Sequence, residues 1–215
     1  MYLADYHTHT RFSPDGSATM TEMAQAALDA GIDCAKVFTY SPSHASYYPG
    51  GKPISIKTVY EKGTGRLLGA QLVGFDGVDK RCDVMATAIR AGMTGPQLAE
   101  LELCYAPPYS SAKDPVNFAG FVIENELNGL VKTFHWHDVA ALPRDGSVTL
   151  LDVRTPSERA GGHISGFIHI PLDELRGRIA ELDKDKPVYV HCHSGLRSYL
   201  ACRLPVSYTH LTLPT

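Results

Sequence analysis

Apolar residues recur along this chain with two different periods, and the change from one to the other divides it into regions. A period of two, typical of half-buried strands, occurs first in four segments. These predicted strands cover residues 4–10, 34–40, 53–61 and 66–74. The polar turn KGTG joins the last two, so residues 34–74 predict an antiparallel meander in which GTGRLLG is a hairpin turn rather than a phosphate loop.

Helical patterns follow this predicted sheet. Capping signals mark two of the helix starts: Thr94 with Gln97 three residues later, and Asp114 directly before Pro115. The predicted helices cover residues 79–92, the segment that starts at Thr94, and residues 114–129. A sheet followed by helices predicts an α+β domain.

After residue 132 the pattern alternates between short strands and short helices. The predicted strands are residues 148–153, 167–171 and 187–191, and the predicted helices are residues 155–160, 172–182 and 198–203. Strands interleaved with helices imply a parallel sheet, so this region predicts an α/β domain.

Composition narrows the function classes. With 20 basic and 23 acidic residues the formal net charge is -3, which argues against a nucleic-acid partner. No apolar run approaches the roughly 20 residues that span a bilayer, and the first residues lack the pattern of a signal peptide, so we expect no membrane partner and a cytoplasmic location. The five cysteines are widely spaced without a CxxC pair, which predicts reduced thiols.

The segment HCHSGLRS carries the sharpest chemical signal. It follows the predicted strand that ends at His191, and ligands of parallel sheets meet the carboxyl ends of strands. A loop that leaves a strand and enters a helix can turn its N–H groups inward, so we expect Cys192 to be a thiolate near neutrality. Arg197 would hold an oxyanion or close the loop, and His191 or His193 would donate to the thiolate or serve the structure.

Three motifs in order, LLDVRTPSE, GHISGFIHIP and HCHSGLRS, resemble a single-domain rhodanese. That resemblance implies catalytic roles for Cys192 and Arg197, with sulfane sulfur carried on Cys192 and no metal. Small sulfur donors and thiol acceptors, such as thiosulfate, persulfides and coenzyme A, are the implied partners. The four intervening residues and the one that follows form the implied active-site loop: His193, Ser194, Gly195, Leu196 and Ser198.

Asp152 and Arg154 match the DVR of the same family. The resemblance implies that they brace the loop together with His191, and a surface salt bridge is the alternative interpretation.

Residues 34–129 resemble the dimerisation domain of flavin-dependent pyridine-nucleotide disulfide oxidoreductases, in the coenzyme A-disulfide reductase and NADH oxidase branch. The motifs SHASYYPG and LELCYAPPYSS carry the likeness and imply a homodimer in which Tyr47 and Tyr105 reach the partner's redox cysteine. Packed interface tyrosines are the alternative. The intact parent enzyme would use FAD and NAD(P)H, but this chain contains no glycine-rich strand-to-helix turn to hold either of them.

The start of the chain has another character. The stretch DYHTHTRFSPDGSATMTEMAQAALDAGI resembles the amino terminus of histidinol-phosphatase-type PHP phosphoesterases, with a helix opened by a Thr19 and Glu22 capping box. His7 and His9 would leave the same face of a strand and could start a metal site, while a polar edge strand is the alternative.

The end of the chain is the last distinct region. The rhodanese resemblance stops near residue 203, and residues 205–215 resemble the translated read-through of a sequencing adapter. Their alternation could form a short strand, but we expect a non-native tail instead. The predicted domains are therefore a phosphoesterase-like βα fragment (1–32), a dimerisation domain (33–132), a truncated rhodanese domain (133–204) and a tail (205–215), joined as a mosaic.

Three functions are compatible with these patterns. The first is a rhodanese-type sulfurtransferase that is the tail of a coenzyme A-disulfide or persulfide reductase. The second is an inactive dimerisation fragment of that flavoprotein. The third is a metal-dependent phosphoesterase, which would require His7 and His9. We rank them in this order.

Overall fold

The computed structural model describes residues 33–134, 136–204 and 211–214. Within these residues the chain forms two compact units, which divide between Leu127 and Asn128. The predicted amino-terminal strand and helix, including His7 and His9, lie outside the described residues.

The first unit is built on a three-stranded antiparallel sheet in the order β1-β2-β3. The strands are β1 (Cys34–Pro42), β2 (Pro53–Glu61) and β3 (Leu67–Gly74), and β2 and β3 form the predicted hairpin. Alternate residues of β2 are buried, as a half-buried strand requires, and they are Ile54, Ile56, Thr58 and Tyr60.

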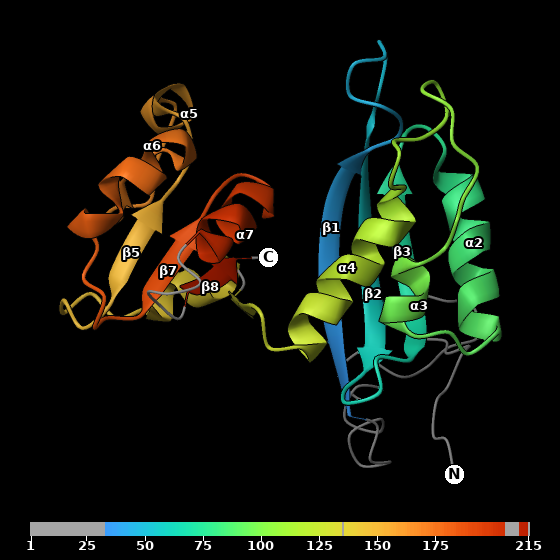
Figure 1. Ribbon diagram of the computed structural model, residues 1–215, viewed down its shortest axis with the longest axis horizontal. Coiled ribbons are helices and arrows are strands. Elements are labelled where there is room, and N and C mark those ends of the chain that lie inside the picture. Colours follow the sequence, from blue (N-terminus) through green and yellow to red (C-terminus); the bar gives the residue numbers. More distant parts are fainter. Residues whose placement is uncertain (1–32, 135, 205–210, 215) are drawn as a thin grey trace, which may run out of the picture. The chain divides into compact units, whose positions relative to one another are not determined.

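Three helices cover the buried face of this sheet (Figure 1). They are α2 (Val78–Arg90), α3 (Gly95–Ala99) and α4 (Pro115–Leu127). Thr94 and Gln97 form the predicted capping box of α3, and Asp114 accepts from the Val116 N–H at the start of α4. Met85, Leu98 and Ile123, one from each helix, are at most 1% exposed and join the core of the first unit.

The second unit is a five-stranded parallel sheet in the order β4-β8-β7-β5-β6. Its strands are β4 (Lys132–Phe134), β5 (Thr149–Asp152), β6 (Ile168–His169), β7 (Val188–His191) and β8 (Leu211–Pro214). Its α-helices are α5 (Pro156–Ala160), α6 (Leu172–Arg178) and α7 (Leu196–Arg203), with 3-10 turns η1 (Trp136–Ala141) and η2 (Ile179–Glu181). The expected fold class, an α+β domain followed by a parallel α/β domain, is confirmed.

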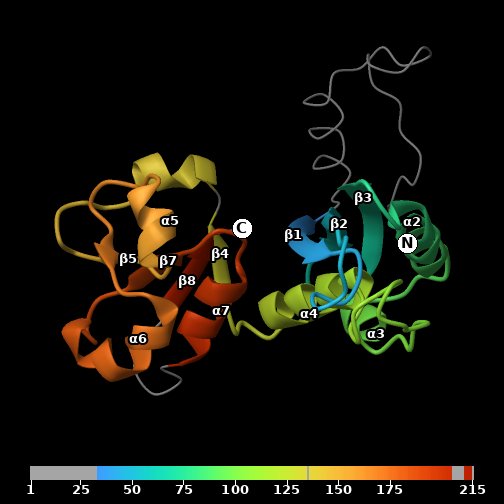
Figure 2. The ribbon, with the colours of Figure 1, turned by 90° about the horizontal axis from the view of Figure 1, so that it is seen from above.

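The expectation that the end of the chain contributes no strand is wrong for residues 211–214. They form β8, which pairs in parallel with β4 on one side and β7 on the other (Figure 2). The sequence Leu-Thr-Leu suits an extended backbone, and the two neighbouring strands offer it ladder partners on both sides.

The core of the second unit lies against the central strands. Leu151, Val188 and Val190 are fully buried, and they pack with Leu175 of α6 and Ala201 of α7. The helix that follows the cysteine loop is thus formed and seated on the sheet. No helix among the described residues is long and apolar enough to cross a membrane.

Candidate active site

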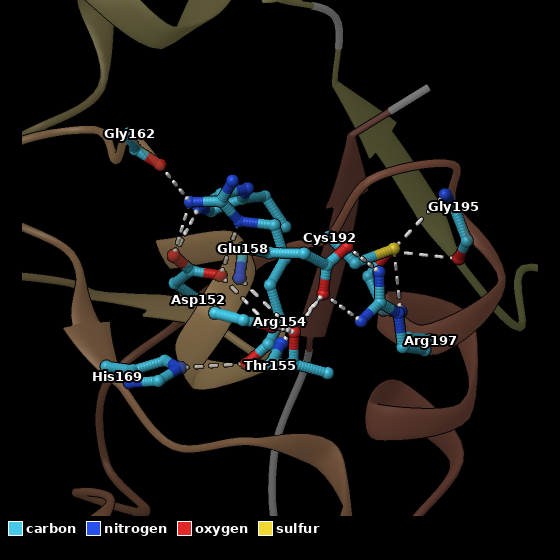
Figure 3. A network of polar contacts seen from close by, with 12 residues as sticks. Asp152, Arg154, Thr155, Glu158, Gly162, His169, Cys192, Gly195 and Arg197 are labelled. Carbon is cyan, nitrogen blue, oxygen red and sulfur yellow. Dashed lines mark hydrogen bonds and ion pairs between the residues drawn. The ribbon is translucent and has the colours of Figure 1, made fainter. Parts of the chain in front are cut away.

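Cys192 lies where the sequence predicts, in the loop that leaves β7 and enters α7. Its half-buried sulfur faces backbone N–H groups of the loop: Gly195 N lies 3.2 Å and Ser198 N 3.4 Å from Sγ (Figure 3). Gly195 has φ 97°, in the left-handed region that favours glycine, which lets the chain turn sharply at this point. The loop therefore curls around the sulfur.

Ser198 closes this loop from inside. Its side chain is fully buried, and Oγ donates to the Gly195 carbonyl at 2.9 Å while lying 3.3 Å from Cys192 Sγ. His193, Ser194 and Leu196 point outward, since all three are exposed. The loop thus has a polar inner wall and an exposed rim.

Arg197 forms an ion pair that the sequence reasoning missed. Its Nη1 and Nη2 donate to the two carboxylate oxygens of Glu158 on α5, at 2.6 and 2.7 Å (Figure 3). The guanidinium holds the pKa of Glu158 well below its usual range, and the pKa of Arg197 is raised. The only signal for Glu158 in the sequence is its capping position after Thr155, which says nothing about Arg197.

Asp152 and Arg154 form an ion pair behind the loop in which the carboxylate is buried and the guanidinium is partly exposed, so it is not the surface salt bridge considered for them. The Asp152 carboxylate is fully buried and accepts from Arg154 Nε at 3.0 Å and Nη2 at 2.9 Å. Burial raises the pKa of Asp152, but the hydrogen bonds from Arg154 outweigh it, and the net shift is downward. Arg154 Nη2 also donates to the Gly162 carbonyl, which ties β5 to the segment after α5.

His191 joins this buried network rather than the sulfur. Its ring packs edge-on against Phe167 with centroids 4.8 Å apart, and Nε2 lies 3.5 Å from Asp152 Oδ2. Burial lowers the pKa of His191, which favours the neutral ring. In the described part of the chain, the polar contacts of Cys192 Sγ come from Gly195 and Ser198 and not from a histidine.

The two predicted tyrosines of the first unit meet each other. The hydroxyls of Tyr47 and Tyr105 lie 2.9 Å apart although the residues are 58 positions apart in sequence. Their side chains are 74% and 49% exposed within the chain. The pKa of Tyr105 is raised by the hydrogen bond with Tyr47. The pair is thus presented at the surface, and its role across a dimer stays a prediction.

Arg81 holds the two tyrosine-bearing loops in place. Its guanidinium is 1% exposed, pairs with Asp114 at 2.8 Å and donates to the carbonyls of Ser43 and Tyr109. These carbonyls belong to the loops that carry Tyr47 and Tyr105. A buried guanidinium with several partners fixes all of them relative to one another.

The described residues contain no group of three or more histidine, cysteine, aspartate or glutamate side chains placed to hold a metal ion. The proposed metal ligands His7 and His9 lie outside them.

Comparisons with known proteins match both units. A model of the rhodanese-like domain matches residues 135–211, and a model of the pyridine nucleotide-disulphide oxidoreductase dimerisation domain matches residues 14–115. The second match begins inside the segment that resembles phosphoesterases.

Two solved structures resemble most of this chain. Reduced CoADR-RHD of Bacillus anthracis is 44% identical, with a TM-score of 0.82 over 88% of this chain and 34% of its own. A NAD-dependent persulfide reductase from A. fulgidus is 41% identical, with a TM-score of 0.77 and the same coverage. A curated coenzyme A disulfide reductase of Staphylococcus aureus (strain bovine RF122 / ET3-1) is 43% identical over 79 residues, which are 37% of this chain and 18% of that relative. The chain therefore spans about a third of the solved relatives and less than a fifth of the curated one.

The cysteine loop after the central strand of the parallel sheet lies within the rhodanese-like match, and the antiparallel sheet with its tyrosine loops lies within the dimerisation-domain match. The chain carries the dimerisation domain of the pyridine nucleotide-disulfide oxidoreductases followed by a rhodanese-like domain, the combination found in its coenzyme A disulfide reductase and persulfide reductase relatives.

Proposed function

We propose that the second unit is a rhodanese-type sulfurtransferase that carries sulfane sulfur as a persulfide on Cys192. The observation that carries this proposal is the loop geometry: two backbone N–H groups and the Ser198 hydroxyl converge on Sγ at the carboxyl end of β7. N–H groups aimed at a sulfur favour its anionic form, and the thiolate is the form that attacks sulfur.

The reaction has two displacement steps. In the first, the Cys192 thiolate attacks the outer sulfur of thiosulfate, the S–S bond breaks, and sulfite leaves with the bonding pair. In the second, a thiolate or cyanide attacks the terminal sulfur of the Cys192 persulfide. The Cys192 thiolate then leaves, and the acceptor becomes a persulfide or thiocyanate. The displacements balance without a redox partner or a metal.

The surrounding residues support these steps in different ways. The N–H groups of Gly195 and Ser198 stabilise the negative sulfur before attack and again when the thiolate leaves. The Asp152 and Arg154 pair and the neutral His191 ring form the rigid wall behind the loop. Because this wall is rigid, the N–H groups stay aimed at the sulfur and need not reorganise during the reaction.

We further propose that the two units belong to a flavoprotein that reduces coenzyme A disulfides or persulfides. FAD and NAD(P)H would supply the hydride and electron transfer in that enzyme. The residues of this chain do not fit those cofactors, since no glycine-rich strand-to-helix turn of the dinucleotide-binding type occurs in its sequence. The first unit would contribute a homodimer interface and the Tyr47 and Tyr105 pair.

The mass of the intact protein after incubation with thiosulfate tests the sulfurtransferase directly. We expect the wild-type chain to gain one sulfur atom, to lose it on addition of cyanide, and to gain none as the Cys192→Ser variant. Cys82→Ser is the matched control, because Cys82 is an exposed thiol on α2 and its loss should leave the gain intact. A wild-type protein that gains no sulfur from thiosulfate and none from an organic persulfide, or a Cys192→Ser variant that still gains it, would contradict the proposal.

A further inference from the structure

We propose that Glu158 is a specificity-determining residue, which makes the Cys192 loop prefer organic persulfides over doubly charged inorganic thiosulfate as sulfur donor. This inference rests on the proposed sulfurtransferase function. It concerns which donor the loop accepts, whereas the proposed function concerns whether Cys192 takes up sulfur at all.

The first support is that the guanidinium of Arg197 is already paired with the carboxylate of Glu158. A loop arginine that receives a sulfonate needs its two terminal nitrogens, which form a fork that matches two oxygens. Here both terminal nitrogens already donate to the Glu158 carboxylate, at 2.6 and 2.7 Å. A donor oxyanion must therefore compete with a carboxylate that is part of the protein.

The second support is that Glu158 is itself held in place. Its Oε2 accepts from the Thr155 N–H and from the Thr155 hydroxyl, both at 2.8 Å, in the capping box of α5. The helix cap and the ion pair share this carboxylate, so moving it away from Arg197 also disturbs the start of α5. The negative charge at the edge of the loop is thus a fixed feature of the site.

The third support is that the neighbouring arginines also have carboxylate partners. Arg154 pairs with the buried Asp152 at 2.9 Å, and Arg159 Nη1 lies 3.4 Å from the same carboxylate. Arg159 also donates to the Phe167 carbonyl. Around this loop, each of the three described guanidiniums meets a carboxylate, which reduces the positive potential available to a dianion.

The fourth support is an apolar side chain on the exposed rim of the loop. Leu196 is 58% exposed directly after Gly195. Thiosulfate has no apolar surface to place against it. The carbon chain of an organic persulfide does, and burying it against Leu196 would favour binding.

The two donors react through the same bond change with different charges. With thiosulfate, the thiolate meets a dianion, and sulfite leaves carrying two negative charges past Glu158. With a neutral persulfide R–S–SH, the thiolate takes the outer SH, the S–S bond breaks, and the thiolate R–S⁻ leaves with one charge. A carboxylate beside the loop therefore raises the barrier for thiosulfate more than for the persulfide.

The test compares kcat/KM for sulfur loading of Cys192 from two donors, thiosulfate and the persulfide of 2-mercaptoethanol generated in the assay. The full chain is used as wild type and as Glu158→Gln. The amide oxygen of glutamine can still accept a hydrogen bond from the Thr155 N–H, because a capping box takes Glu or Gln. Helix α5 should therefore keep its cap. We expect kcat/KM of the variant to rise about tenfold with thiosulfate and to stay within about twofold of wild type with the persulfide.

Glu181→Gln is the matched control, because Glu181 is an exposed glutamate that pairs with Arg178 in the same unit. It removes the same charge and should leave the donor ratio unchanged. Glu158→Asp is the second variant, which retains the charge but draws it back from Arg197, and we expect a smaller shift in the same direction. Equal changes with both donors in Glu158→Gln, or no change, would overturn the proposal and leave Glu158 a purely structural residue. A wild-type chain that takes sulfur from neither donor would instead contradict the sulfurtransferase itself.

Discussion

Among the described residues, the polar contacts of the Cys192 sulfur are backbone N–H groups and the Ser198 hydroxyl rather than charged side chains. The charged residues that surround Asp152 lie behind the loop and make no polar contact with the sulfur. Asp152 is the centre of this group, since Arg154, Arg159 and His191 all approach its carboxylate. A fully buried carboxylate with cationic partners is costly to disturb, because the partners remain when the charge is removed.

Replacement of this carboxylate gives the first prediction. Asp152→Asn should lower the free energy of unfolding of the second unit by about 2 to 4 kcal/mol at pH 7. The pKa of Asp152 is lowered in the folded protein, so its contribution is complete above the unfolded pKa of about 3.9 and is lost as the pH falls through the folded value. The difference between wild type and variant should therefore shrink in acid.

Urea unfolding followed by tryptophan fluorescence measures this effect, because the single tryptophan of the sequence, Trp136, belongs to the second unit. Glu181→Gln is the control, because its ion pair with Arg178 is exposed and we expect this variant to unfold like wild type. An Asp152→Asn variant that also unfolds like wild type would show that the Asp152 and Arg154 pair does not stabilise the unit.

Among the elements, those with strong local signals were predicted from the sequence. Strand β2 alternates cleanly between buried and less buried residues, and Thr94 and Asp114 mark helix starts by their own side chains. The pairs that connect elements could not be predicted in this way. Glu158 and Arg197 are 39 positions apart and meet only because β5 and β7 are neighbours in the sheet. Neither the types of these two residues nor their spacing in the sequence indicates that the two strands are adjacent.

The contact between α3 and α4 gives a prediction at the scale of elements. A Cβ atom at Gly120 of α4 would lie 2.4 Å from the Ala99 nitrogen and 2.7 Å from the Gly95 carbonyl oxygen. Both are backbone atoms, so the helices would have to move apart. Gly120→Ala should therefore destabilise the first unit by about 1 to 3 kcal/mol.

Thermal unfolding followed by far-UV circular dichroism measures this change, with the Trp136 signal as an internal reference for the second unit. Gly69→Ala is the matched control, since a Cβ at Gly69 on β3 meets nothing within 4 Å. We expect the control to melt like wild type. If Gly120→Ala also does so, the two helices can separate at little cost and the close contact is not a constraint.

For the whole molecule, the order of an antiparallel domain and a parallel domain followed from the change in period along the sequence. The strand β8 did not, because the alternation of these residues fitted a short strand but their resemblance to a read-through tail argued against one. At the site, the place of HCHSGLRS after a predicted strand indicated where the Cys192 loop lies, but the ion pair that occupies Arg197 depends on the folded sheet.

The match to a dimerisation domain predicts that the whole chain self-associates. Sedimentation equilibrium between micromolar and submillimolar protein should show a mass that rises from the 23.4 kDa of one chain towards twice that value. The dimer should not depend on the sulfur chemistry, because Cys192 belongs to the other unit. Cys192→Ser should therefore sediment like wild type while it loses sulfur loading. A mass that stays at one chain throughout would mean that residues 33–127 keep the fold of a dimerisation domain without its association. The Tyr47 and Tyr105 pair would then have no partner subunit to reach.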